Sequence, residues 1–192
     1  MPNSREIGII NELECGRAKT RHADGGYVNS DCGTPQGIRL VLDLTSNDLQ
    51  KYLSSVVDDF NPAASTTLGI RGYADKLTQL GRTIAAVSAS SETEEIVGIL
   101  AGYFNNPEQG FSFISAFHVR HPFRRMHIGR MLMDKAIAIS RVAGFQALRL
   151  KVDKTNLAGI AFYEQYGFAK IGEDAEQLEM DFNIRGNCND GM

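Results

Sequence analysis

A single apolar run constrains the fold of this chain more than any other feature. Residues 111–119 include only two serines and one histidine among apolar side chains, which predicts a strand buried on both faces and therefore central in a sheet. After a basic segment, apolar residues recur at helical spacing from Ile128 until Gly144 closes the pattern. A buried strand that leads into a long amphipathic helix is typical of an α/β or α+β domain with a mixed sheet.

The other elements are predicted from the same periodicities. Further strands are expected at residues 38–44, 83–89, 95–104, 147–152, 168–172 and 178–182, with a polar turn at 90–94 that makes a hairpin. Helices are expected from a Thr45 cap to Asn61–Pro62, then along one face from Ile70 to a stop at Gly81, and at 156–166. Together they predict a mixed, mostly antiparallel central sheet of about six to seven strands flanked by about four helices.

These elements define one domain with a segment on either side. Residues 37–184 carry the periodic patterns and form the predicted domain. Residues 1–36, which contain many Gly, Asn, Asp and Thr, are predicted to be an N-terminal extension of unknown role with at most one short element at 7–13. Residues 185–192 are predicted to form a flexible tail.

Composition and charge exclude several classes of partner. With 192 residues, 43% hydrophobic and 22% charged, the chain has the make-up of a globular domain. Its net charge of −3 argues against a nucleic-acid partner, and no apolar run approaches the roughly 20 residues of a membrane-spanning helix. Cys15, Cys32 and Cys188 are isolated from one another, and the first residues do not form a secretory signal. We therefore expect no disulfide framework and no metal site, in the reducing cytoplasm.

The basic segment between the apolar strand and the long helix is the clearest candidate site. Four arginines and two histidines fall within residues 120–130 of a chain that is acidic overall. The start of a helix presents unpaired N–H groups and the positive end of the helix dipole, so this junction suits a phosphate group. Gly129 would let such a ligand approach the backbone closely. The alternative is a solvated basic turn without a ligand.

The same segment resembles the phosphate-binding motif of the GNAT superfamily of acetyl-CoA-dependent N-acetyltransferases. That motif is a strand ending in Val followed by roughly V-x-P-x-x-R-x-x-G-x-G/A at the start of a helix, and the matching residues are Val119, Arg124, Ile128 and Gly129. Two positions depart from it. The proline comes one residue late, at Pro122, and His127 replaces the first glycine. If the backbone at His127 requires a positive φ, histidine is costly there.

A second segment strengthens the resemblance, which spans about residues 37–182. The family pattern N-x-x-A-x-x-(F/L)-Y-x-x-x-G-F is matched by Asn156, Phe162, Tyr163, Gly167 and Phe168, whereas Gly159 replaces its alanine. The resemblance implies that acetyl-CoA binds where the strand ending at Val119 splays from its neighbour. The residues it assigns to this binding are Phe117, His118, Val119, Arg124, Arg125, Met126, His127, Ile128, Gly129, Arg130, Asn156, Ala158, Phe162 and Tyr163.

The resemblance also implies direct transfer of the acetyl group to an amine. Tyr163 is then the expected general acid for the thiolate leaving group, since a phenol can donate a proton to sulfur. The alternative is a tyrosine that only packs within its helix. His118 is the one titratable residue of the central strand, and its ordinary pKa of about 6.5 suits a general base. A buried histidine of the core, a water molecule or an already deprotonated acceptor remain alternatives.

The expected acceptor is a small-molecule or protein amine, and the sequence does not identify which one. Its pocket is expected between the first helices and the last strands, with the polar candidates Arg71, Tyr73, Tyr103 and Asn105. A catalytically inactive acyl-CoA-binding regulatory or interaction domain is one alternative, and a nucleotide- or RNA-binding module that uses the basic turn is another. The sequence does not decide whether the protein forms a homodimer. For residues 1–36, the alternatives are a place at an oligomer interface or over the acceptor cleft.

Overall fold

The computed structural model describes residues 19–21, 27–29, 37–58, 63–90 and 93–185. Two compact units, residues 1–34 and 35–192, can be separated. In the first, β1 (Lys19–Arg21) pairs antiparallel with β2 (Tyr27–Asn29), a small hairpin that the sequence did not predict. The element expected at residues 7–13 lies outside the described residues, as do the three cysteines and the tail beyond residue 185.

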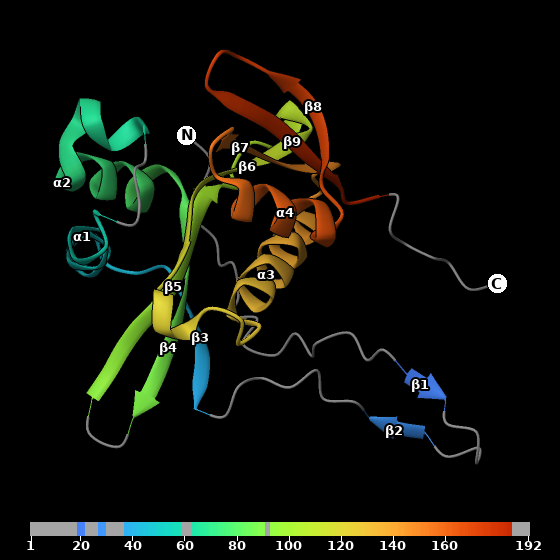
Figure 1. The fold of residues 1–192 in the computed structure, drawn as a ribbon, viewed down its shortest axis with the longest axis horizontal. Coiled ribbons are helices and arrows are strands. Elements are labelled where there is room, and N and C mark those ends of the chain that lie inside the picture. Colours follow the sequence, from blue (N-terminus) through green and yellow to red (C-terminus); the bar gives the residue numbers. More distant parts are fainter. Residues whose placement is uncertain (1–18, 22–26, 30–36, 59–62, 91–92, 186–192) are drawn as a thin grey trace, which may run out of the picture. The chain divides into compact units, whose positions relative to one another are not determined.

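The second unit is built on a seven-stranded sheet (Figure 1). Its strands, in spatial order, are β3 (Ile38–Leu42), β4 (Arg82–Ser90), β5 (Thr93–Tyr103), β6 (Phe111–Val119), β7 (Ala147–Asp153), β9 (Gln177–Asn183) and β8 (Ala169–Glu173). Among the strands that the structure describes, only β6 and β7 pair in parallel, because α3 crosses over between them. The mixed, mostly antiparallel sheet is confirmed, and the apolar run of β6 occupies its middle position.

Helices cover both faces of this sheet. On one face lie α1 (Ser46–Ser55) and α2 (Ala63–Leu80), and on the other α3 (Ile128–Val142) and α4 (Leu157–Tyr166) (Figure 1). Two short 3-10 turns, η1 (Pro107–Gln109) and η2 (His121–Phe123), bracket β6. The four predicted helices are therefore confirmed.

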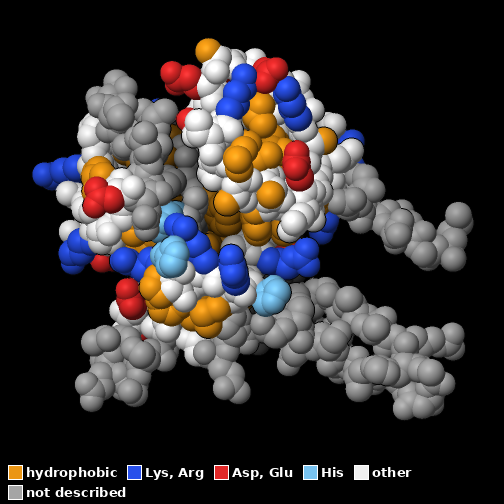
Figure 2. Space-filling view, viewed as in Figure 1, with side chains coloured by type: hydrophobic (Ala, Val, Ile, Leu, Met, Phe, Trp, Pro, Cys, Tyr) orange, Lys and Arg blue, Asp and Glu red, His pale blue; other side chains and the backbone are white. Residues whose placement is uncertain are grey.

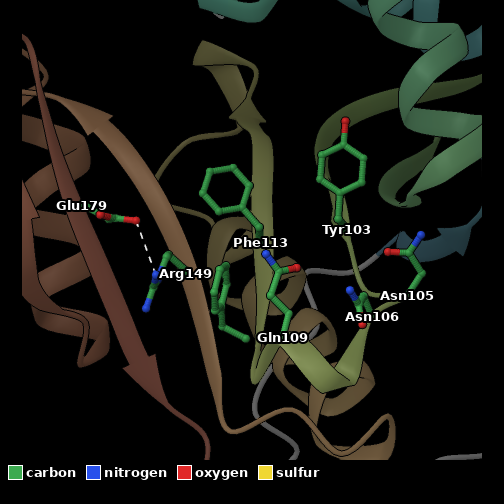
Figure 3. Close-up of a pocket in the computed structure, with 8 residues that line it drawn as sticks. Tyr103, Asn105, Asn106, Gln109, Phe113, Arg149 and Glu179 are labelled. Atoms are coloured by element: carbon green, nitrogen blue, oxygen red, sulfur yellow. Dashed lines mark ion pairs between the residues drawn. The ribbon is translucent and has the colours of Figure 1, made fainter.

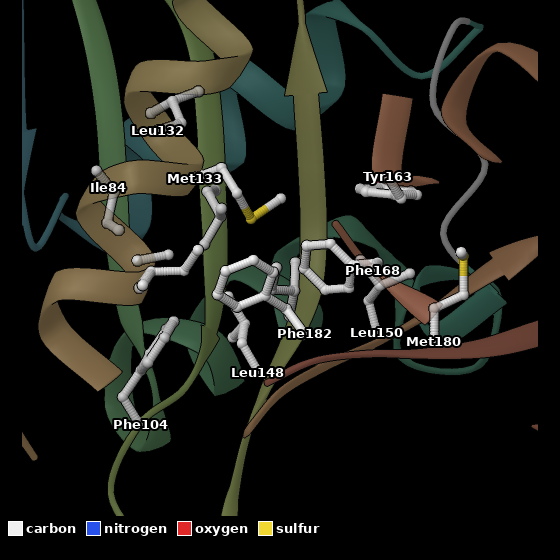
Figure 4. Packing of buried hydrophobic residues seen from close by; sticks show 14 of the residues in the cluster. Ile84, Phe104, Leu132, Met133, Leu148, Leu150, Tyr163, Phe168, Met180 and Phe182 are labelled. Carbon is white, nitrogen blue, oxygen red and sulfur yellow. The ribbon is translucent and has the colours of Figure 1, made fainter. Parts of the chain in front are cut away.

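Each face has its own hydrophobic core. The larger one lies under α3 and α4, where the fully buried Leu132 and Met133 of α3 belong to one cluster with Leu148 of β7 and the aromatic rings around Tyr163 (Figure 4). Burial of one such leucine or methionine contributes about 1.5–3 kcal/mol. The smaller core joins α1 and α2 to β4 and β5. Among the described residues, this smaller core includes none from β7 or β9. On this face of the sheet, those two strands therefore lie outside the core under α1 and α2.

Several predicted boundaries were wrong. β3 ends at Leu42 rather than at residue 44, because Asp43 turns the backbone to a φ of 56°. The first helix ends at Ser55, before the proline that was expected to stop it, and its Thr45 cap is confirmed by the bond from the Asp48 N–H. The turn between β4 and β5 is also shorter than residues 90–94, since Ser90 already pairs with Thr93.

Two further sequence expectations concern membranes and metals. Within the described ranges, no helix is long and apolar enough to cross a membrane. In the same part of the chain, no group of three His, Cys, Asp or Glu side chains lies close enough together to hold a metal ion.

Candidate functional site

The central strand separates from its parallel neighbour halfway along its length. Residues 111–114 of β6 pair with residues 147–150 of β7. β6 then continues to Val119 and β7 to Asp153 without pairing to each other, although both stretches are described. The separation coincides with a bulge at Ser115, where the register between β5 and β6 shifts by one residue. Beyond Ile114 the backbone of β6 is therefore not paired with β7.

The N-terminus of α3 lies just beyond this opening. The first hydrogen bond within the helix runs from the Met131 N–H to the His127 carbonyl at 3.0 Å, so the N–H groups of Ile128, Gly129 and Arg130 have no acceptor inside the helix. A Cβ atom on Gly129 would lie 3.3 Å from the Phe117 ring and 3.4 Å from the Phe162 ring. Glycine therefore lets the first turn of α3 sit directly against β6 and α4.

His127 caps this helix in the left-handed conformation. Its φ is 60°, and its side chain makes no capping hydrogen bond. Arg125 has a similar φ of 64°. The backbone at residue 127 thus has the conformation that glycine adopts freely, and a side chain with a Cβ costs about 1–2 kcal/mol there. Such a cost lowers the stability of the loop but leaves its N–H groups in place.

Replacement of His127 by glycine is expected to stabilise the protein by about 1 kcal/mol, because the positive φ then carries no steric penalty. The midpoint of thermal unfolding should rise by several degrees in a calorimetric scan. Met126→Gly is the matched control, since Met126 is adjacent and exposed but has no positive φ. It should lower the midpoint through the entropy of the unfolded chain. A His127→Gly protein that melts below the parent would contradict the strained cap.

The arginines of the basic segment fall into two groups. Arg120 is held on the α1 side of the sheet, where it donates from Nε to the Ile96 carbonyl at 3.0 Å and from Nη2 to Ser55 Oγ at 2.7 Å. Arg124 and Arg130 are exposed on the loop and the first turn of α3. In Figure 2, lysine or arginine and histidine side chains gather in a band at the lower middle, where Figure 1 places the loop from β6 to α3.

The exposed cations of the loop keep most of their donors available. Arg124 uses Nε to bond the Val119 carbonyl at 3.0 Å, which bends its side chain back over the end of β6. The Arg130 guanidinium stacks 5.6 Å from the centre of the Tyr166 ring. Arg125, Met126 and His127 are exposed beside them. Of the predicted phosphate-binding residues, the structure therefore gathers Arg124 to Arg130 at one helix N-terminus.

Tyr163 lies in an aromatic cluster on the α3 and α4 face of β6. Its ring centre is 6.0 Å from that of Phe117, 5.6 Å from that of Phe162 and 5.6 Å from that of Phe168. Burial raises the pKa of its phenol well above the ordinary value, so the hydroxyl stays protonated at neutral pH. In the described part of the chain no group forms a hydrogen bond with this hydroxyl. Its proton is consequently not committed to a structural bond there.

His118 lies on the opposite face of the same strand. Its Nδ1 is 2.8 Å from the hydroxyl of Tyr52 on α1, and the two rings meet edge to face. Burial raises the pKa of Tyr52, an effect that the nearby Arg120 partly offsets. Alternation along the strand thus separates His118 from the face on which Phe117 meets Tyr163, by one residue of β6.

Asn156 caps the helix that carries Tyr163. Its Oδ1 accepts the Gly159 N–H at 2.9 Å, which satisfies one of the free donors at the start of α4. A Cβ atom on Gly159 would lie only 2.6 Å from Asn156 Nδ2. Glycine in place of the alanine of the resembled motif therefore leaves room for the cap. Ala158, in the first turn, is exposed.

A cavity of about 570 Å³ opens on the α1 and α2 face of the sheet (Figure 3). It brings together two of the four predicted acceptor residues, Tyr103 and Asn105. The amide of Asn105 also donates to the Leu80 carbonyl at 2.7 Å. Tyr73 lies apart from the cavity wall, buried, with its hydroxyl bonded to Ser115 at the bulge, and Arg71 is exposed on α2.

Sequence reasoning missed the charged side of this cavity. Arg149 of β7 binds Asp181 of β9 through two bonds of 2.7 and 2.9 Å, and its guanidinium lies 3.6 Å from Glu179. Tyr103, Phe113, Arg149 and Asp181 are register partners on successive strands, so they form one row across the sheet. The alternation of residues 147–152 marks Arg149 as facing away from the apolar side, but only the strand order joins it to Tyr103.

Comparison with solved structures agrees with this architecture. An acetyltransferase of the GNAT family from Staphylococcus aureus aligns with a TM-score of 0.61 at 15% identity, over 77% of this chain and 99% of its own. The PaiA N-acetyltransferase from Thermoplasma acidophilum, solved with coenzyme A, aligns with a TM-score of 0.56 at 17% identity, over 76% and 98%. The spermidine N-acetyltransferase from Vibrio cholerae, a dodecamer, gives 0.61 at 14%, over 82% and 100%.

At these identities the solved structures establish the fold alone. No curated protein sequence is significantly similar to the chain. A sequence model of the acetyltransferase (GNAT) family, however, matches residues 53–168, more than half of the chain, and this stretch includes both the opening between β6 and β7 and the helix of Tyr163. With fold and family sequence pattern in agreement, the chain belongs to the acetyltransferase (GNAT) family.

Proposed function

We propose that the protein transfers the acetyl group of acetyl-CoA directly to a primary amine while both are bound. The observation that carries the proposal is the separation of β6 from β7 immediately before a helix N-terminus with open N–H groups. Such an arrangement accommodates an extended arm between the strands and a pyrophosphate at the helix. Holding donor and acceptor together makes the attack effectively unimolecular, which is a large part of the catalysis.

The residues present fit this donor. The N–H groups of Ile128, Gly129 and Arg130 and the cations of Arg124 and Arg125 offer hydrogen bonds and positive charge for two phosphates. Phe117, Val119, Asn156, Ala158 and Phe162 then line the path of the arm in the proposal. Acetyl-CoA supplies a thioester, whose carbonyl carbon accepts the attack of an amine. The cytoplasm remains the expected compartment.

Tyr163 is the proposed general acid. Attack by the amine nitrogen forms the new C–N bond, cleavage of the C–S bond releases a thiolate, and the Tyr163 hydroxyl gives its proton to that sulfur. Burial favours the protonated phenol, which is the form the step requires. The reprotonation of Tyr163 from solvent completes the cycle.

His118 is the proposed base that receives the proton of the amine. It lies on the α1 side of β6, one residue from Phe117, and its contact with Tyr52 fixes the orientation of its ring. His118→Asn is expected to lower kcat by at least about ten-fold, while the Kd of acetyl-CoA stays within two-fold. Fixed-time assays of thiol release measure kcat, and calorimetric titration measures the Kd of acetyl-CoA. An unchanged kcat would exclude His118 as the base.

Titration calorimetry with acetyl-CoA, beside free CoA and ATP, tests the proposed function. We expect acetyl-CoA to bind and ATP to bind at least about ten-fold more weakly, because ATP lacks the pantetheine arm that the strand opening accommodates. A panel of primary amines then follows, with release of the free thiol as the readout. Binding without turnover of any amine would favour the acyl-CoA-binding regulatory domain instead.

A further inference from the structure

We infer that the cavity beside Tyr103 holds the positively charged, non-reacting end of a diamine acceptor, an inference that rests on the proposed transfer to an amine. The first observation is chemical. Aromatic rings, amide groups and one ion pair form the wall, with Tyr103 and Phe113 facing the cavity across from Glu179 (Figure 3). Aromatic faces combined with a carboxylate are a favourable surrounding for an ammonium group.

The second observation is the balance of charge. Arg149 is the only cation among the described residues that line the cavity, and two carboxylates already surround it: Asp181 in a paired bond and Glu179 at 3.6 Å. Lys151 lies two residues further along β7, is the register partner of Glu179 on β9, and pairs with Asp174 at 3.4 Å. One carboxylate therefore exceeds the cations at this wall, so a ligand with a positive charge restores neutrality. A ligand carboxylate would meet a guanidinium that is already neutralised.

The third observation is the distance from the cavity to the start of the opening, where the arm proposed to lie between β6 and β7 would end. Phe113 and Arg149 are paired one residue before the last pair of β6 and β7, beyond which the strands separate. The cavity therefore borders the closed end of the opening. The bulge at Ser115 and its neighbour Ala116 lie two to three residues further along β6. At about 3.3 Å per residue this is roughly 7–10 Å, the length of a short alkyl chain.

The reacting amine itself is a poor occupant of this site. It must lose its proton before it attacks, and contact with Glu179 would stabilise the protonated form and oppose the attack. A second amine, which stays charged throughout, can keep that contact during the whole reaction. The cavity thus selects for an acceptor with two amines separated by about five carbons, rather than for a simple alkylamine.

The test compares three acceptors that each contain five carbons: 1,5-diaminopentane, pentylamine and 5-aminopentanoate. We expect the parent to favour the diamine over pentylamine by at least about ten-fold in kcat/KM, with the aminopentanoate poorest. In Glu179→Gln the preference should fall below about three-fold through a higher KM, with acetyl-CoA affinity unchanged. Glu173→Gln on β8 is the matched control, because Glu173 is exposed, pairs with Lys154 and Lys170 and does not line the cavity.

A binding measurement separates this inference from the transfer function. Calorimetric titration of 1,5-diaminopentane into the protein saturated with CoA should give binding that Glu179→Gln weakens at least about ten-fold. Diamine binding without acetylation would support the cation site and refute the transferase. Acetylation of amines with no preference for the diamine, a preference for the aminopentanoate, or an unchanged preference in Glu179→Gln would overturn the inference while leaving the transferase intact.

Discussion

Replacement of Gly129 by glutamate is expected to abolish measurable binding of acetyl-CoA, with a rise in Kd of at least about 100-fold. The new carboxylate would lie at the first turn of α3, among the N–H groups proposed to hold the pyrophosphate. A unit charge about 5 Å from a phosphate charge is opposed by about 3 kcal/mol at an effective dielectric constant of about 20, which corresponds to about 100-fold in Kd. Calorimetric titration with acetyl-CoA measures the effect.

Two variants keep this result interpretable. Gly129→Ala adds a Cβ near Phe117 and Phe162 without charge, and so measures the steric part alone. Val142→Glu places the same charge at the exposed far end of the same helix, about 20 Å away, and should leave binding unchanged. Because a carboxylate near a helix N-terminus favours the helix, Gly129→Glu should still fold. Acetyl-CoA binding of parental strength in folded Gly129→Glu would rule out the α3 N-terminus as the phosphate site.

Substitution of Tyr163 by phenylalanine is expected to lower kcat by at least about ten-fold, the low end of what a positioned acid contributes, with little change in acetyl-CoA affinity. Phenylalanine keeps the ring contacts with Phe117 and Phe162 and removes only the hydroxyl, for which the described residues supply no hydrogen-bond partner. The deficit should be the same from pH 6 to pH 9, since burial holds the pKa of Tyr163 above its ordinary value. Steady-state thiol release across that range provides the measurement.

Tyr166→Phe is the matched control for this second result. Tyr166 lies three residues further along α4 and donates its hydroxyl to Asp134, so its removal costs about 1 kcal/mol of stability without touching the proposed acid. We expect kcat of Tyr166→Phe within about two-fold of the parent, in line with a purely structural bond. If both variants lost activity equally, the effect of Tyr163 would be one of packing in the aromatic cluster, and the acid would have to be sought elsewhere.

Local sequence determined most of the elements. The apolar run of β6 can be buried only in the middle of a sheet, and the structure places it fourth of seven strands. The Thr45 cap and the start of α3 at Ile128 follow from hydrogen bonds between near neighbours in the chain. Errors occurred where a single backbone angle ended an element. The positive φ of Asp43 is an example, because an aspartate can also continue a strand.

Only the tertiary structure decided which residues meet. From sequence, Arg149 and Glu179 are unremarkable polar residues of two separate strands, and Tyr103 belongs to a third. Strand order and register place Tyr103, Phe113 and Arg149 in one row, with Glu179 beside it. Register depends on the packing of the whole sheet, since a shift by one residue turns every side chain to the other face. The proposed phosphate end of the site was therefore readable in one continuous segment, whereas the residues of the proposed acceptor end come together only after four strands have paired.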